Sequence, residues 1–421
     1  MKCTALKITL IACLLMLLAG CELMNETTYA VNEVNREELH KNLADDFPAS
    51  ANQSEENPEA ANVLQEHPLP SSADNLPNAN EKTSEDTVSN SDSWPRDITS
   101  ESKIPVIGEI VRWENGFSSV DFAGDDGLDA FLKQGGAVND AQVAEFLANN
   151  LLADVTFSGS PFGCSTLAVK SPNGESLFGR NFDWQTCEAL VVQAKPKTGY
   201  ASISTVNMDF IRQGSGEGLK AALEQNEPRV LAALYAPLDG MNEKGLAVAV
   251  NMIEDAASIN QDTGKIDLTT TTAIRLLLDK AANVNEALAL LEQYDLHASL
   301  GMMVHFVLAD TSGRSVAVEY INNEMVVVET PAVTNFYLAA GAKQGIGTQQ
   351  SHTRYELLLQ ALSEQETMDS AALREVLDRV SKDNFGEFES TQWSAVFNLT
   401  AGEVQYYHRE NYQYGYTFSI N

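Results

Sequence analysis

The sequence predicts a layered α+β domain, and three observations support this fold class. Short apolar runs typical of strands recur in groups after Cys164, helical stretches occur in pairs between them, and no internal repeat is found. Sheets and helices each have an apolar surface that must be covered, so this succession favours stacked layers. The chain has 421 residues, which is enough for two domains or for one large domain and a disordered segment.

The chain begins with the features of a secretory signal peptide. Lys2 and Lys7 precede an apolar run over residues 8–20, which ends in Leu-Ala-Gly before Cys21. The run is too short to cross a bilayer as a helix, which takes about 20 residues. The pattern resembles a bacterial lipoprotein signal peptide, which implies that residues 1–20 are removed and that Cys21 carries lipid. The protein would then be anchored in the bacterial cell envelope, facing the periplasm or the exterior. The alternative is an ordinary signal peptide with a cysteine at its cleavage site.

Residues 21–103 are predicted to form a disordered acidic tether. Residues 22–103 hold 18 Asp and Glu against 5 Lys and Arg, and six of the chain's 13 prolines. Such a segment cannot bury enough apolar surface to offset the entropy lost on ordering. A flexible spacer between a lipid anchor and a folded domain is physically sensible.

The composition argues against several classes of partner. The formal net charge is −32, whereas nucleic-acid phosphates and anionic lipid surfaces are bound by Lys and Arg. The sequence also has no cluster of Cys and His at ligand spacing. We therefore expect no nucleic acid, no metal and no cofactor.

Residues 104–163 are predicted to form a small, mostly helical segment. Asn139 has the residue type of an N-cap, and the apolar residues that follow it share one helical face. These residues are Val143, Phe146, Leu147 and Leu151. The segment ends in the loop-forming sequence Ser-Gly-Ser-Pro-Phe-Gly before Cys164.

Residues 164–421 are predicted to form the strand-rich domain. Pro172-Asn-Gly174 is a hairpin turn between strands at 165–169 and 176–178. The nearly continuous apolar run at 246–253 is typical of a strand covered on both faces. Further strands are expected at 190–194, 201–206, 304–309, 315–320, 325–329, 393–399, 404–408 and 416–420. Helices are expected at 271–278, 285–293, 353–362 and 370–380.

Cys164 is the candidate nucleophile. After signal-peptide removal and lipidation, only Cys164 and Cys187 remain as thiols. They could form a disulfide in an oxidising compartment, or one could be a working thiol. No histidine lies in a local signature of the papain or caspase kind. If the Gly163–Cys164 bond is cut, the freed α-amine, whose pKa is ordinarily about 8, could serve as the base instead.

Cys164 and the hairpin after it resemble a known family. The sequence Gly-Arg-Asn-Phe-Asp at 179–183 places Arg180 and Asp183 at positions 164 + 16 and 164 + 19. The same spacing occurs in the linear-amide hydrolases of the N-terminal-nucleophile superfamily. These include bile salt hydrolase, penicillin V acylase, acid ceramidase and N-acylethanolamine acid amidase. The resemblance implies the superfamily's four-layer αββα sandwich and a nucleophilic Cys164 that self-cleavage after Gly163 makes the first residue of the catalytic chain.

Three further motifs extend the resemblance over residues 164–421. Asp-Gly-Met-Asn-Glu-Lys-Gly-Leu at 239–246 precedes a strand that carries Asn251, Val-Thr-Asn at 333–335 carries Asn335, and Ser-His-Thr-Arg at 351–354 carries Arg354. The resemblance implies that Asn251 and Asn335 donate hydrogen bonds to an oxyanion and that Arg354 supports the charge balance. Asp183 could hold the ammonium or thiol of Cys164, and Arg180 would favour the thiolate.

The long extension before Cys164 resembles the acid ceramidase group, in which a helical N-terminal subunit is released by self-cleavage and stays bound. The implied activity is hydrolysis of a linear, non-peptide carbon–nitrogen amide bond in a small N-acyl compound. Bile salts, penicillin V, N-acyl amines, N-acyl homoserine lactones and ceramides remain alternative substrates. Two other classes stay open, namely a thiol peptidase of another fold, which would need a catalytic histidine, and a non-catalytic binding lipoprotein.

Overall fold

The computed structural model describes residues 105–151, 154–159, 163–213, 228–383, 385 and 389–420. The predicted signal peptide, Cys21, the whole of the predicted tether and its boundary with the next segment lie outside these residues. Among the helices in the described ranges, none is both long and apolar enough to cross a membrane.

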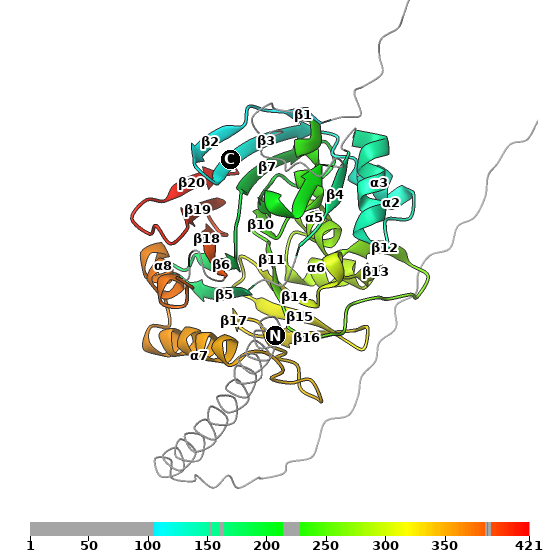
Figure 1. The fold of residues 1–421 in the computed structure, drawn as a ribbon. Helices are drawn as coiled ribbons and strands as arrows, with labels where there is room; N and C mark the ends of the chain where they lie inside the picture. The colour runs from blue at the N-terminus through cyan, green and yellow to red at the C-terminus, as the bar shows by residue number, and fades with distance from the viewer. Residues whose placement is uncertain are drawn as a thin grey trace, which may run out of the picture. The chain divides into compact units, whose positions relative to one another are not determined.

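The larger of two main sheets has ten strands (Figure 1). Their order is β1-β3-β7-β8-β10-β11-β14-β15-β16, and β2 pairs with β3 at one end. Every neighbouring pair is antiparallel except β3 and β7, which run parallel. The strands are β1 (Val106–Ile107), β2 (Val111–Glu114), β3 (Phe117–Gly124), β7 (Ala189–Pro196), β8 (Ser202–Asn207), β10 (Asp239–Asn242), β11 (Ala247–Met252), β14 (Val304–Ala309), β15 (Ser315–Ile321) and β16 (Glu324–Glu329).

The second main sheet has six antiparallel strands in the order β17-β5-β6-β18-β19-β20. They are β17 (Ala332–Val333), β5 (Gly163–Lys170), β6 (Ser176–Trp184), β18 (Ser390–Asn398), β19 (Glu403–His408) and β20 (Tyr416–Ser419). Two small sheets complete the described strands. They pair β4 (Val155–Phe157) with β9 (Ile211–Gln213), and β12 (Ile266–Thr269) with β13 (Tyr294–His297).

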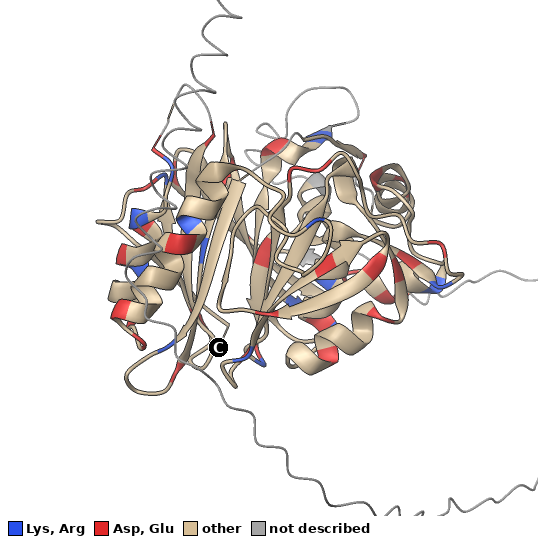
Figure 2. Cartoon of the chain, turned by 90° about the horizontal axis from the view of Figure 1, so that it is seen from below, with Lys and Arg blue, Asp and Glu red and all other residues tan. Residues whose placement is uncertain are grey.

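Helices cover the outer faces of the two main sheets. α5 (Thr270–Lys280) and α6 (Val284–Leu291) pack on the ten-stranded sheet, and α7 (Gln349–Glu364) and α8 (Ser370–Arg379) pack on the six-stranded sheet. Figure 2 shows the two sheets between these helical layers. The arrangement is a four-layer αββα sandwich and confirms the predicted fold class. The remaining helices are α2 (Leu128–Lys133), α3 (Asp140–Leu151) and the 3-10 turns η1 (Met208–Phe210), η2 (Pro228–Tyr235) and η3 (Ser299–Gly301).

Strand alternation divides the side chains of β6 between two cores. Phe178 and Phe182 face the ten-stranded sheet, and Phe182 stacks on Trp393 of β18 with ring centroids 4.0 Å apart. Leu177 joins the separate core beneath α7 and α8. Asn181 faces the same way, because its amide donates a hydrogen bond to a main-chain carbonyl of α8. Since β6 is buried on both faces, its polar residues must find partners inside the protein.

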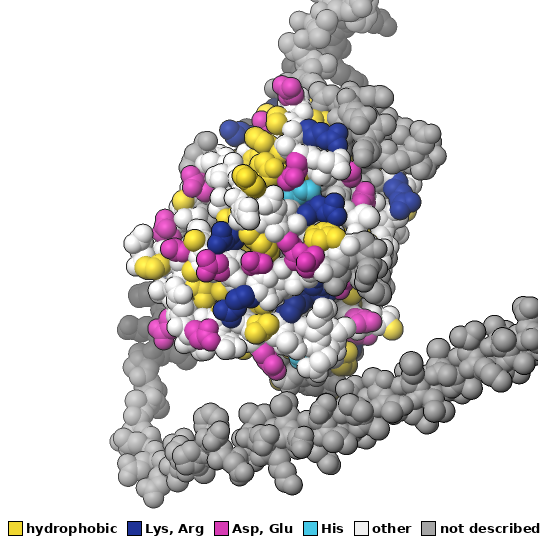
Figure 3. Space-filling model, turned by 60° about the vertical axis from the view of Figure 1, so that its left-hand side comes forward, with side chains coloured by type: hydrophobic (Ala, Val, Ile, Leu, Met, Phe, Trp, Pro, Cys, Tyr) yellow, Lys and Arg dark blue, Asp and Glu magenta, His cyan; other side chains and the backbone are white. Residues whose placement is uncertain are grey.

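The surface of the domain is mixed in charge. On the face shown in Figure 3, acidic and basic side chains are interspersed with scattered apolar ones. The large net negative charge of the chain therefore does not gather into one patch on this face.

The segment before Cys164 differs from its mostly helical prediction. The helix predicted after Asn139 is confirmed, because α3 begins at Asp140 and the Asn139 side chain accepts a hydrogen bond of 3.1 Å from the main-chain N–H of Gln142. However, residues 106–124 contain the three strands β1, β2 and β3, and β3 pairs with β7 along its full length. The segment is mixed because the partner that makes β3 a strand lies more than 60 residues further along the chain, beyond the reach of local pattern.

A buried pair of carboxyl groups joins this segment to α5. Asp126 follows β3, Asp279 lies in the last turn of α5, and each has an Oδ2 atom with no donor among the described residues. Burial is the main cause that raises the pKa of Asp279 to about 7, and the nearby Asp126 adds to it, whereas Arg275 acts in the opposite direction. A proton held between the two carboxyl groups would supply the missing donor.

This pair predicts a specific pH dependence of stability. Because the folded pKa of Asp279 is raised, its contribution to the free energy of unfolding is full below pH ~4 and is lost as pH rises through about 7. Asp279→Asn, which cannot ionise, should flatten this part of the dependence in urea unfolding at pH 5 and pH 8. Asp129→Asn is the control, since this largely exposed carboxylate of α2 has a lowered pKa and does not titrate in that range. A wild-type slope in Asp279→Asn would contradict the prediction.

Candidate active site

The hairpin of β5 and β6 brings the sequence motif together. Gly163 pairs with Asp183, Cys164 with Phe182, and Thr166 with Arg180. Paired residues of antiparallel strands share a face of the sheet and neighbours alternate. Arg180 therefore lies on the face of the Cys164 thiol, between the two sheets, whereas Asp183 lies on the opposite face, toward α7 and α8.

On the thiol side, Arg180 is held by a buried network. Its Nε donates to Asp239 Oδ2 at 2.7 Å and its Nη1 to Asn251 Oδ1 at 2.6 Å. Asp239 Oδ2 also accepts a hydrogen bond of 3.0 Å from the indole of Trp393. All of these side chains are fully buried, so the ion pair is shielded from solvent and fixes the guanidinium beside the sulfur.

On the main-chain side, three polar side chains surround Cys164. Its main-chain N–H donates to Asn335 Oδ1 at 2.9 Å, and its carbonyl oxygen accepts from Arg354 Nη2 at 3.1 Å. The same Nη2 donates to Asn335 Oδ1 at 2.8 Å, and Arg354 Nη1 donates to Asp183 Oδ2 at 2.6 Å. Strand β17 pairs only with residues 166 and 167 of β5, so side chains take the place of main-chain partners at Cys164.

Two residues that the sequence analysis did not single out contact Asp183. The Thr391 hydroxyl donates to Asp183 Oδ1 at 2.7 Å. Lys382, in the connection between α8 and β18, has its Nζ 3.8 Å from Asp183 Oδ2. A bulge at Gln392 lets Thr391 and Trp393 pair with neighbouring residues of β6, which puts the hydroxyl on the Asp183 side and the indole on the Arg180 side.

The two predicted asparagines connect β11 to β17 and to the segment that follows it. Asn251 Nδ2 donates to the carbonyl of Val333 at 3.2 Å, and Asn335 Nδ2 donates to the carbonyl of Met252 at 2.7 Å. Because Asn335 Oδ1 receives two donors, its contact with Cys164 is as an acceptor at the main-chain nitrogen. The oxyanion roles of both residues stay predictions.

A buried His305–Glu319 pair supports the strand end that carries Asn335. His305 Nδ1 lies 3.1 Å from Glu319 Oε1, and its Nε2 lies 2.8 Å from the Thr334 carbonyl. Glu319 also accepts the main-chain N–H groups of Leu338 and Ala339 at 2.8 and 2.9 Å. The pair thus fixes the chain on both sides of Asn335.

The Cys164 thiol is closed off and protonated in this state. Its side chain is 0% exposed. Burial raises the pKa of the thiol to about 12, with a smaller increase from Asp183, against the lowering effects of Arg180 and Arg354. Cys164 and Cys187 are both free thiols, so the alternative of a disulfide between them is not realised. The intact chain therefore holds Cys164 as a buried, protonated thiol.

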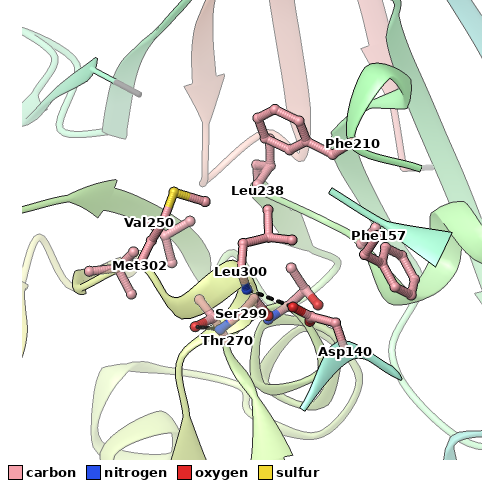
Figure 4. A pocket seen from close by; sticks show the side chains of 12 residues that line it. Asp140, Phe157, Phe210, Leu238, Val250, Thr270, Ser299, Leu300 and Met302 are labelled. Carbon is pink, nitrogen blue, oxygen red and sulfur yellow. Dashed lines mark hydrogen bonds between the residues drawn. The ribbon is translucent and has the colours of Figure 1, made fainter. Parts of the chain in front are cut away.

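A small apolar cavity of about 40 Å³ lies beside β11, on the face of the strand opposite Asn251. Its walls include Val250, Phe157 of β4, Phe210 of η1 and Leu300 of η3 (Figure 4). Asp140 of α3 accepts a hydrogen bond of 2.6 Å from the Leu300 N–H. The segment before Cys164 thus forms part of this cavity wall.

The six residues predicted between 164 and 354 converge at one place, from β5, β6, β11, the segment after β17, and α7. Gly163 lies directly beside them, and Cys21 is outside the described residues. Asp239 could have been added from the sequence, because it opens the motif at 239–246. Lys382 and Thr391 lie in none of the motifs, so the sequence gives no indication that they contact Asp183. Among the described residues, no cluster of His, Cys, Asp and Glu is arranged to hold a metal ion.

Comparison with known proteins identifies the domain. Residues 164–335 match the family model of linear amide C-N hydrolases, choloylglycine hydrolase family. Residues 164–335 therefore belong to this family. The match makes the chain an amide hydrolase that acts on linear amides, which confirms the family resemblance and the class of enzyme.

Solved structures of low sequence identity are similar to part of this chain. A variant of the conjugated bile acid hydrolase from Clostridium perfringens is 17% identical, with 61% of this chain and 92% of that chain covered and a TM-score of 0.46. Penicillin V acylase from Agrobacterium tumefaciens is 18% identical, with 60% and 90% covered and a TM-score of 0.42. No curated protein sequence is significantly similar to the chain.

The Arg180–Asp239 ion pair predicts a strong effect of Asp239→Asn. The substitution leaves the buried guanidinium without its counter-charge, which should lower the free energy of unfolding by about 3 kcal/mol and reduce amide hydrolysis. Chemical denaturation and kcat/KM measure the two effects. Asp209→Asn is the matched control, because the Asp209 carboxylate accepts a solvent-exposed hydrogen bond from the Thr186 hydroxyl and its replacement should change stability by less than ~1 kcal/mol. Equal stability of the two variants would contradict the assigned role of the pair.

Proposed function

We propose that this chain is a secreted, lipid-anchored amidase that hydrolyses a small N-acyl amide with Cys164 as an N-terminal nucleophile. The membership in the choloylglycine hydrolase family supports amide hydrolysis. The nucleophile, its release by cleavage after Gly163, and the lipid anchor at Cys21 are the parts that we infer.

One observation carries the assignment of the nucleophile. The main-chain nitrogen of Cys164 is bound by a side-chain oxygen of Asn335 at 2.9 Å, and the Asp183 carboxylate lies on the same face as Gly163. An internal strand residue ordinarily gives its N–H to a main-chain carbonyl of the next strand. Here the surroundings of that nitrogen suit a free amine, which needs an acceptor and a nearby carboxylate to hold it in place.

Self-cleavage would convert the intact chain to this form. The Cys164 sulfur adds to the Gly163 carbonyl carbon, a carbon–sulfur bond forms, and the carbon–nitrogen bond breaks. The thiol proton ends on the departing nitrogen, which becomes the α-amine. Water then hydrolyses the thioester, leaving a Gly163 carboxylate and restoring the thiol.

The freed residue could then act on an external amide. The α-amine accepts the thiol proton as the sulfur attacks the substrate carbonyl, and it passes that proton to the leaving amine. Water attacks the resulting thioester, again losing a proton to the α-amine, and the acid is released. The products are one carboxylic acid and one amine for each water consumed. Arg180 would steady the thiolate, and Asp183 with Asn335 would orient the amine.

The decisive measurement is the intact mass and N-terminal sequence of the purified protein. Wild type should yield a fragment that begins at Cys164, whereas Cys164→Ala should stay whole and inactive. A panel of bile salts, penicillin V, N-acyl amines, N-acyl homoserine lactones and ceramides then identifies the substrate class. A wild-type chain that stays whole and still hydrolyses amides would rule out the amine mechanism.

Histidine replacement tests the alternative of a thiol peptidase. Of the described histidines, His297 bonds Asp267 and Asn260, and His352 stacks on Phe336, so both rings have partners other than Cys164. His297→Gln and His352→Gln should therefore keep amide hydrolysis within a few-fold of wild type. Loss of all activity in either would favour a histidine base.

The lipid anchor rests on the signal-like sequence before Cys21. Wild-type protein expressed in a bacterium should partition into detergent and incorporate labelled fatty acid, whereas Cys21→Ser should do neither while its amidase activity is retained. A water-soluble, unlabelled wild-type protein would refute the anchor without affecting the proposed mechanism.

A further inference from the structure

Lys382 is a buried cation that the proposed mechanism does not use. Its side chain is 4% exposed, and a lysine at that depth requires a counter-charge. Its ammonium forms an ion pair with Glu389 and lies 3.8 Å from Asp183 Oδ2. Two hydrogen bonds with Thr391 fix the backbone of Lys382. The Thr391 N–H donates to the Lys382 carbonyl, and the Thr391 hydroxyl accepts a hydrogen bond from the Lys382 N–H.

The ammonium also rests on the residue that precedes the nucleophile. A Cβ atom added at Gly163 would lie 2.7 Å from Lys382 Nζ and 2.9 Å from Asp183 Oδ2. The backbone of Gly163 is not in the left-handed region that favours glycine. A larger residue there would instead have to displace the Lys382 ammonium or the Asp183 carboxylate. The missing side chain makes room for Lys382 next to the Gly163–Cys164 bond.

Several charged groups face this corner of the molecule. They are Asp183 from β6, Arg354 from α7, Lys382 and Glu389 from the connection between α8 and β18, and Glu410 after β19, while Arg180 of β6 lies on the other face, beside the Cys164 thiol. Glu389 is 34% exposed while Lys382 is almost fully buried, so solvent screens the carboxylate more than the ammonium. Within this pair the Lys382 ammonium is therefore the less screened charge.

We propose that Lys382 is a positioning residue that keeps the freed α-amine of Cys164 in its neutral, base-competent form. This inference rests on the proposed cleavage after Gly163. Asp183 alone would favour the protonated amine, because an opposite charge stabilises the charged form. Lys382 shares the Asp183 carboxylate with Arg354 and, as a like charge beside the amine, opposes protonation.

The test is the pH profile of kcat/KM, whose acidic limb reports the ionisation of the essential base in the free enzyme. Lys382→Met should move this limb to higher pH by about one unit, because the amine then keeps its proton longer. Lys382→Arg, which retains the charge, should return the acidic limb to the wild-type pH. Lys170→Met is the control, because Lys170 lies at the other end of β5 from Gly163 and bonds Ser176 and the Thr311 carbonyl. The acidic limb of Lys170→Met should match that of wild type.

Intact mass separates the possible failures. If wild type is uncut yet active, the proposed function fails and this inference with it. If all proteins are cut and Lys382→Met loses activity equally at every pH, Lys382 has a structural role only and the inference is overturned. If Lys382→Met stays uncut, Lys382→Gln is used in its place to measure the pH profile. If both stay uncut while Lys382→Arg is cut, the charge acts in cleavage rather than on the amine, which also overturns the inference.

Discussion

The pairing of β5 with β6 is the constraint on which the rest of the site depends. It sets Cys164 opposite Phe182 and Gly163 opposite Asp183. Arg180 and Asp183 are three residues apart on one strand, so they must point to opposite faces. The sulfur of Cys164 is therefore contacted by groups between the two sheets, and its main-chain nitrogen by groups on the side of α7 and α8. A shift of the register by one residue would exchange the two faces and separate the thiol from Arg180.

The electrostatics follow from this two-sided arrangement. Each face supplies one arginine and one carboxylate, with Arg180 and Asp239 on the sulfur side and Arg354 and Asp183 on the nitrogen side. Pairing on each face lets the protein bury four charges without leaving any of them uncompensated. Burial raises the pKa of the Cys164 thiol although Arg180 and Arg354 lower it, so in the intact chain these pairs do not outweigh burial.

The sequence was informative where spacing or local pattern encodes the structure. The hairpin, the helix after Asn139 and the convergence of Cys164, Arg180 and Asp183 could be predicted because each depends on a short stretch of chain. The strand nature of residues 117–124 could not, because it depends on pairing with β7. Lys382 and Thr391 reach Asp183 from the other end of the domain, and only the bulge in β18 and the turn after α8 bring them there. Such contacts leave no mark in the residue pattern.

The parallel pairing of β3 with β7 bears on how a cut chain would hold together. Eight residues of β3 pair in register with β7, and Phe117, Val120 and Phe122 of β3 are buried. If the chain is cut after Gly163, the two pieces still share one continuous sheet and one core. The N-terminal piece could leave only by exposing the open edge of β7, so its dissociation would amount to unfolding part of the enzyme. A lipid attached to that piece would then retain the catalytic piece as firmly as the domain is stable, with no covalent link between them.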